Sequence, residues 1–89
     1  MTVHEPSPNK LLASFSTLVI SIATSAVVSL GLEKNPQTDK FEKNLDLAQY
    51  SIDLLVLLKG KTKNNLTPSE QTYLDAIVQD LQLKFVQAK

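Results

Sequence analysis

The stretch that decides the fold runs from Leu11 to Leu32 and reads LLASFSTLVISIATSAVVSLGL. It contains no charged residue, and at the helical step of about 100° per residue its side chains separate into two faces. One face carries hydroxyl side chains: Ser14, Thr17, Ser21, Thr24, Ser25 and Ser29. The opposite face carries apolar side chains: Leu12, Phe15, Val19, Ala23, Ala26, Val27 and Leu30. We therefore predict a long first helix over residues of about 9–31, uncharged from Leu11 onward, with Gly31 ending it.

A second amphipathic pattern follows a polar linker that contains an Asn-Pro turn signal. Apolar side chains recur there at spacings of four and three residues, and three more widen the stripe: Phe41, Leu45, Ala48, Ile52 and Leu55, with Leu47, Leu54 and Leu58. Thr38 or Asp39 can cap the start of this helix. We predict a second helix over residues 39–59, ending near Lys59–Gly60.

The third helix has the clearest start signal in the chain. Thr67-Pro68-Ser69-Glu70 places a capping hydroxyl, a proline at the first helical position and a glutamate three residues after the cap. We predict a helix over residues 68–87 from this signal. The predicted core positions of the second and third helices are Ile52, Leu55, Leu74, Ile77 and Leu81.

Three helices joined by short loops predict an all-α fold, a small antiparallel three-helix bundle. The 89 residues suit one domain, which we place at residues 9–89 behind a disordered tail at residues 1–8. A chain this short buries only about 60% of its unfolded surface. Because it has no cysteine for a disulfide, it needs well-packed helices or a partner chain.

The composition disfavours several classes of site. Cysteine is absent and His4 is the only histidine, so a thiolate nucleophile and a site with two imidazole ligands are excluded. Nine basic residues balance nine acidic residues, which argues against nucleic-acid binding driven by charge. We predict no catalytic, cofactor-binding or metal-binding residues, no cofactor, and a protein that is not an enzyme.

Three short patterns suggest sites, and each has a simpler interpretation. Lys59-Gly60-Lys61-Thr62 matches the tail of a phosphate-binding loop, but Leu55 stands where that motif needs glycine, so we interpret it as a helix end. With Lys63 these lysines form a basic cluster that is typical of a solvated turn. Asp46 and Asp53 are about 10 Å apart along a helix, too far to share a proton.

The uncharged helix predicts an interaction surface. A helix face turned to water more usually carries Lys or Glu among its serines, and small side chains let two helix backbones approach closely. We predict a homo-oligomer, most simply a two-fold dimer, that associates through Ser14, Thr17, Ser21, Ser25 and Ser29. The other face would pack on its own chain through Phe15, Val19, Ala23 and Leu30. The function would then be that of a cytoplasmic module that binds itself or another protein.

The same stretch admits a second interpretation. Its 22 residues would span about 33 Å as a helix, enough for the hydrocarbon core of a bilayer. The alternative is therefore a small membrane-associated protein anchored by residues 11–32. The gathering of Ser and Thr on one face, with Lys10 and Lys34 near the two ends, favours the buried helix of a soluble oligomer.

Several blocks of the sequence occur in a familiar order. They are Phe15–Ala26, Leu30-Gly31, Asn35-Pro36, Asn44-Leu45 and Lys61–Thr67. Together they resemble the small bacterial proteins grouped as the domain-of-unknown-function 1844 (DUF1844) family, over residues of about 15–86. The resemblance implies a bacterial origin and a compact helical domain, and it transfers no activity and no site residue. Two positions depart from it: Asn64 stands where glycine is expected, and Gly60 where an acidic residue is expected.

Overall fold

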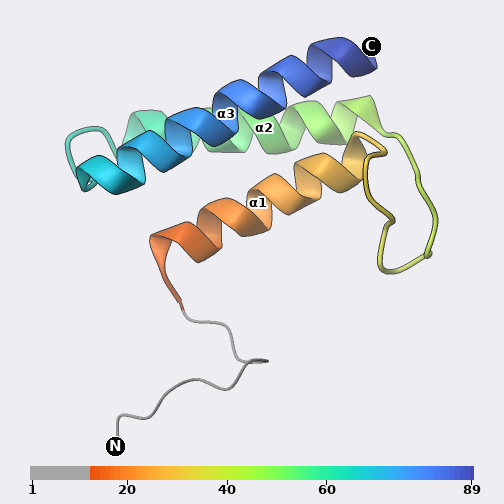
Figure 1. Ribbon diagram of the computed structural model, residues 1–89, viewed down its shortest axis with the longest axis horizontal. Coiled ribbons are helices and arrows are strands. Elements are labelled where there is room, and N and C mark those ends of the chain that lie inside the picture. Colours follow the sequence, from red (N-terminus) through yellow and green to blue (C-terminus); the bar gives the residue numbers. More distant parts are fainter. Residues whose placement is uncertain (1–12) are drawn as a thin grey trace, which may run out of the picture.

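The computed structural model describes residues 13–89 and contains three α-helices (Figure 1). They are α1 (Phe15–Ser29), α2 (Leu45–Lys61) and α3 (Pro68–Ala88). Each helix runs antiparallel to the next, so α1 and α3 run in the same direction (Figure 1). Among the described residues the only extended pairings are two isolated bridges in the loop between α1 and α2. The predicted all-α three-helix bundle is confirmed.

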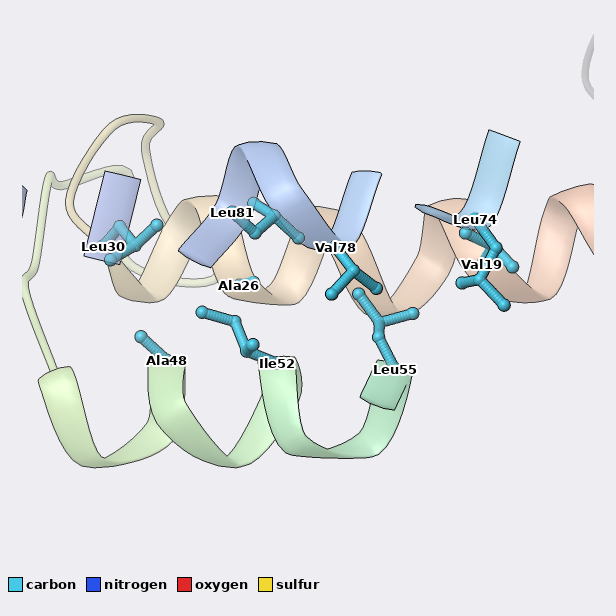
Figure 2. Close-up of a cluster of buried hydrophobic side chains, with 9 residues drawn as sticks. All are labelled: Val19, Ala26, Leu30, Ala48, Ile52, Leu55, Leu74, Val78 and Leu81. Atoms are coloured by element: carbon cyan, nitrogen blue, oxygen red, sulfur yellow. The ribbon is translucent and has the colours of Figure 1, made fainter. Parts of the chain in front are cut away.

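The core lies where the three helices meet. Its buried apolar side chains are Val19, Ala26, Leu30, Ala48, Ile52, Leu55, Leu74, Val78 and Leu81. Figure 2 shows the side chains of α2 pointing toward those of α1 and α3. Four of the five predicted core positions are buried, and the fifth, Ile77, is half-buried at the edge of the cluster. Val78 takes the inner position on that turn, with 4% of its surface exposed.

The start of α1 differs from the prediction. Ser14 has an extended backbone, and its Oγ accepts a hydrogen bond from the Thr17 N–H at 3.1 Å, which is the geometry of an N-cap. A helix running unbroken from residue 9 is therefore not formed, because the cap sets the first helical residue at Phe15. The predicted disordered tail at residues 1–8 lies outside the described residues.

The end of α1 agrees with the prediction that Gly31 stops this helix. Gly31 has a left-handed backbone, with φ of 79°. The Gly31 N–H bonds to the Val28 carbonyl at 3.0 Å, and the Leu32 N–H bonds to the Val27 carbonyl at 3.2 Å. These two bonds form a Schellman motif, in which glycine avoids the steric cost of the left-handed conformation.

The length of α1 bears on the membrane interpretation. Fifteen residues make a helix of about 22 Å, shorter than the 33 Å expected from the uncharged stretch and shorter than a bilayer core of about 30 Å. Among residues 13–89, none of the helices is both long enough and apolar enough to span a membrane.

The loop between α1 and α2 turns back onto the end of α1, and this moves the start of α2. The Asn44 N–H donates to the Ser29 carbonyl at 2.7 Å, and the Asn44 side chain accepts the Leu47 N–H at 3.0 Å. Asn44 is therefore the N-cap, and the predicted start at residue 39 is wrong. Asp39 has φ of 58°, a conformation that no right-handed helix contains, and Phe41 lies in the loop with 62% of its surface exposed.

The connection between α2 and α3 also differs from the prediction. Gly60 lies inside α2, which continues to Lys61, so glycine does not stop this helix. The Thr62 N–H and hydroxyl both donate to the Leu58 carbonyl, at 3.0 and 2.7 Å. The chain then reverses at Asn64, whose φ of 69° is the conformation that glycine adopts readily and that asparagine tolerates. This explains why asparagine can occupy the position where the family resemblance led us to expect glycine.

The predicted start of α3 is confirmed. The Thr67 hydroxyl accepts the Glu70 N–H at 3.1 Å, and the Glu70 carboxylate accepts the Thr67 N–H at 2.9 Å. This reciprocal capping box satisfies two backbone donors, and Pro68 occupies the first helical position.

Candidate functional site

The predicted hydroxyl stripe lies along the outside of α1. Ser14, Ser21 and Ser25 are exposed, and Thr17 is half-buried. The Ser21 hydroxyl donates to the Thr17 carbonyl at 2.9 Å, so its polar group is satisfied within the helix. The Ser14 and Thr17 hydroxyls lie 2.9 Å apart. The hydroxyls of Ser14, Thr17 and Ser21 are therefore hydrogen-bonded within this end of α1 and leave a weakly polar surface.

Ser29 is the exception in the predicted stripe. Only 5% of its surface is exposed, because the loop that leads into α2 closes over the end of α1. The hydrogen bond from the Asn44 N–H to the Ser29 carbonyl holds the two segments together. Ser29 therefore serves the packing of its own chain, whereas Ser14, Thr17, Ser21 and Ser25 remain on the outside.

The opposite side of α1 packs against α2 and α3, as predicted. Val19 and Leu30 are buried, and Phe15 and Ala23 pack against the core at its edge. The outward side, which we call the outer face of α1, carries no charge. It consists of Thr17, Leu18, Ile20, Ser21, Thr24, Ser25 and Val28. Leu18 and Ile20 border it and are 47% and 49% exposed.

A groove of about 550 Å³ runs along the C-terminal half of this face. Ser21, Thr24, Ser25 and Val28 of α1 line its base, and Leu47 of α2 lines one side. The remaining lining comes from Ser29 at the end of α1 and from the loop, through Asn35–Gln37 and Glu42–Asn44. The charges that border the groove, on Glu42 and Lys43, therefore come from the loop end and not from α1.

The loop wall is held by hydrogen bonds within the loop. The Asn35 side chain accepts the Gln37 N–H at 2.9 Å, and the Asn35 N–H donates to the Lys40 carbonyl at 2.8 Å. The Thr38 hydroxyl donates to the Glu42 carboxylate at 3.2 Å. Sequence reasoning found the Asn-Pro turn but treated this segment as a linker, so it missed the groove. The local signal was Asn35, whose side chain can fix a turn two residues ahead.

An apolar ridge on α2 lies beside the groove. Leu47, Tyr50, Leu54 and Leu57 follow one another at spacings of three and four residues, so they share one flank of the helix. Leu54 is half-buried, and the other three are 48%, 59% and 55% exposed. We call these four residues the α2 ridge. Leu47, which widens the apolar stripe of α2 in the sequence, lies outside the core and lines the groove.

Of the charged residues considered from the sequence, Lys59 lies between α2 and α3, whereas Asp46 and Asp53 flank the α2 ridge, four and three residues from Tyr50. Lys59 pairs with Asp75 of α3 at 3.0 Å, and the hydrogen bond from its ammonium group holds the pKa of the Asp75 carboxyl below its ordinary value of 3.8. Asp46 and Asp53 are exposed, and Asp53 accepts a hydrogen bond from the Gln49 amide at 2.8 Å. Lys59 thus has a structural partner that joins α2 to α3.

Comparison with known proteins yields one match. The model of the family described as "Domain of unknown function (DUF1844)" matches residues 12–87, which include all three helices up to the last turn of α3. No curated protein and no solved structure shows detectable similarity to the chain.

Proposed function

The chain belongs to the DUF1844 family, and we propose that it is a non-enzymatic helical module that works by pairing with a second copy of itself through the outer face of α1. One observation carries the proposal. α1 packs on its own chain along one side only, and its exposed side has no charged residue over its 15-residue length. Surface helices ordinarily carry charged residues on the side that faces water.

The side chains of this face suit close helix contact. Ser21, Thr24 and Ser25 are small, so another helix can approach the α1 backbone. Their hydroxyl groups add little desolvation cost where they already donate to backbone carbonyls, as Ser21 does. Leu18 and Ile20 would lose the half of their surface that is now exposed, which is favourable by about 25 cal/mol per Å² of apolar area.

A matched pair of charge substitutions tests the proposal. Ser25→Glu introduces a carboxylate into the outer face, where burial without a partner is costly. Ser16→Glu makes the same change on the same helix, at an exposed position outside the outer face. Light scattering after size-exclusion chromatography would give the molar mass of both variants and of the wild type, and circular dichroism would verify that each remains helical.

The expected result is a wild type and a Ser16→Glu variant of about twice 9.8 kDa, and a Ser25→Glu variant near 9.8 kDa. A helical Ser25→Glu variant that keeps the mass of the wild-type dimer would contradict the proposal. A monomeric wild type would contradict it more directly, and would leave the uncharged face available to a different protein.

A further inference from the structure

We propose that, in this dimer, the α2 ridge of each copy inserts into the α1 groove of the other. The inference rests on the proposed self-association and adds which surfaces meet. In this arrangement α2 contributes to the interface as much as α1 does. Each contact joins α1 of one copy to α2 of the other, and the two α1 helices do not pair with each other. The second copy is identified as the occupant by the shape, the area and the charge of the face that the two helices form together.

The surface that the outer face of α1 and the α2 ridge form together is complementary to itself in shape. α1 and the loop before α2 form a groove in which most of the α1 side chains are small, whereas α2 contributes large apolar side chains, three of them about half-exposed. The ridge from Leu47 to Leu57 is about 15 Å long, and the outer face of α1 from Thr17 to Val28 is about 17 Å long, of which the groove occupies about 11 Å from Ser21 onward. Leu47 and Tyr50 therefore meet the groove, and Leu54 and Leu57 meet the N-terminal part of the outer face. The ridge therefore fits within the length of the stripe, and an isologous dimer requires such self-complementarity.

A single two-fold axis satisfies both contacts. α1 and α2 lie side by side and antiparallel, and Leu47 lies level with the groove because it lines it. A two-fold axis that is parallel to these helices and lies above the face places α1 of one copy over α2 of the other. Rotation about this axis leaves the position of each residue along the helix direction unchanged. Tyr50, one turn beyond Leu47, then lies over the part of the partner's groove that contains Ser21.

The area of the interface also favours the use of both helices. A helix is about 10 Å wide, so α1 alone offers about 220 Å² in flat projection. A standard interface buries about 800 Å² of accessible surface on each partner. With α2 about 9 Å away, the projected area about doubles, and side-chain relief raises the accessible area of such a face further. An interface that uses both helices therefore comes closer to the area of a standard interface than one that uses α1 alone.

The charges agree with a second copy as the occupant. The outer face of α1 and the four residues of the α2 ridge carry no charge, and the charges on Glu42 and Lys43 border only the loop end of the groove. A partner surface rich in charge would therefore lose hydration over most of this face without gaining an ion pair. The same chain presents a surface that meets this condition. Tyr50 suits the groove because its ring is apolar while its hydroxyl can bond to the serine and threonine hydroxyls that line the base.

The first test compares two leucines of nearly equal exposure. Leu57 on the ridge is 55% exposed and Leu83 on α3 is 58% exposed. We expect Leu57→Glu to raise the dimer dissociation constant by about tenfold or more, and Leu83→Glu to change it by less than about twofold. Sedimentation equilibrium gives the constants. If Leu57→Glu fails to fold by circular dichroism, Tyr50→Glu replaces it, since Tyr50 is 59% exposed.

The second test is charge complementation between chains. Ser21→Lys and Tyr50→Glu should each weaken self-association, because each homodimer would bury two unpaired charges. Mixed in equal amounts, they should form a heterodimer in which one ridge–groove contact is native and the other is a Lys–Glu pair. Native mass spectrometry distinguishes this heterodimer by mass. A mixture that stays as monomeric as its two components overturns the inference.

These outcomes separate this inference from the proposed function. If Ser25→Glu breaks the dimer while Leu57→Glu and Tyr50→Glu leave it intact, the dimer exists but pairs α1 with α1, and only the ridge-in-groove arrangement fails. A monomeric wild type overturns both.

Discussion

The chain has two glycines, and the structure predicts that replacing each by alanine changes stability in opposite directions. Gly31 ends α1 with φ of 79°, in the left-handed region that residues with a Cβ adopt at a cost. Gly60 lies within α2, and a Cβ added there meets nothing within 4 Å. From the sequence alone both glycines were interpreted as helix stops, so the pair tests what the structure adds.

The magnitudes follow from backbone conformation. A left-handed alanine costs roughly 1–2 kcal/mol, and the loss of glycine's unfolded-state entropy returns about 0.4–1 kcal/mol, so Gly31→Ala should destabilise by about 1 kcal/mol. Packing adds little, because the new Cβ would lie 3.4 Å from the Lys43 Cβ. Gly60→Ala replaces glycine inside an exposed helical turn, which should stabilise by about 0.5–1 kcal/mol.

Urea unfolding followed by circular dichroism at a single protein concentration measures both effects. One kcal/mol corresponds to a change in Tm of about 4–8 °C for a domain of this size. The Tm of Gly31→Ala should therefore lie below that of the wild type, and the Tm of Gly60→Ala above it. A fixed concentration is needed because self-association adds a concentration-dependent contribution to stability. If both substitutions destabilise, or if Gly31→Ala is neutral, the assignment of these helix ends is wrong.

Leu55→Ala should destabilise the fold by roughly 2–5 kcal/mol, because Leu55 is fully buried at the centre of the core. Leu83→Ala, at a position 58% exposed, should cost under about 1 kcal/mol. A small effect of Leu55→Ala in urea unfolding would show that the packing of α2 described here is wrong. Thr67→Ala should destabilise by about 1 kcal/mol by removing the acceptor for the Glu70 N–H, and an unchanged melting curve would rule out the cap. Because Lys59 lowers the pKa of Asp75, the ion pair stabilises the fold above the ordinary pKa of 3.8 and this stabilisation is lost as the pH falls through the lowered value. Wild type should therefore exceed Asp75→Asn in urea midpoint at pH 7 and lose that advantage at acidic pH; a difference that does not depend on pH would contradict the pairing.

The sequence predicted the features that depend on residues close together in the chain. The capping box at Thr67 and the stop at Gly31 each rest on contacts within five residues, so their chemistry could be recognised from spacing alone. The apolar stripe of α1 was equally clear, because a buried face repeats with the helical period.

The start of α2 could not be found in this way. Thr38, Asp39 and Asn44 are all residues that cap helices well, and the apolar spacing from Phe41 onward favoured the earlier ones. The choice depends on a contact between segments far apart in the chain, since the Asn44 N–H bonds to the carbonyl of Ser29. Phe41 is left in the loop for the same reason.

The candidate site was predicted in part. The exposed hydroxyls of α1 were identified from their spacing, but the groove needs the loop around Asn35–Gln37, which the sequence shows only as a turn. The α2 ridge was missed because apolar residues occur on two adjoining flanks of α2, and spacing alone does not show which flank the core covers. That distinction depends on where α1 and α3 lie against α2.

The molar mass of the wild-type chain in solution tests the proposed dimer most directly. Sedimentation equilibrium from low micromolar to several hundred micromolar protein would measure it without a column or a substitution. For the proposed dimer, the mass should rise with concentration to about 19.6 kDa, twice 9.8 kDa, and stop there because a two-fold contact closes. A mass that stays at 9.8 kDa throughout, or one that keeps rising beyond the dimer, would contradict it.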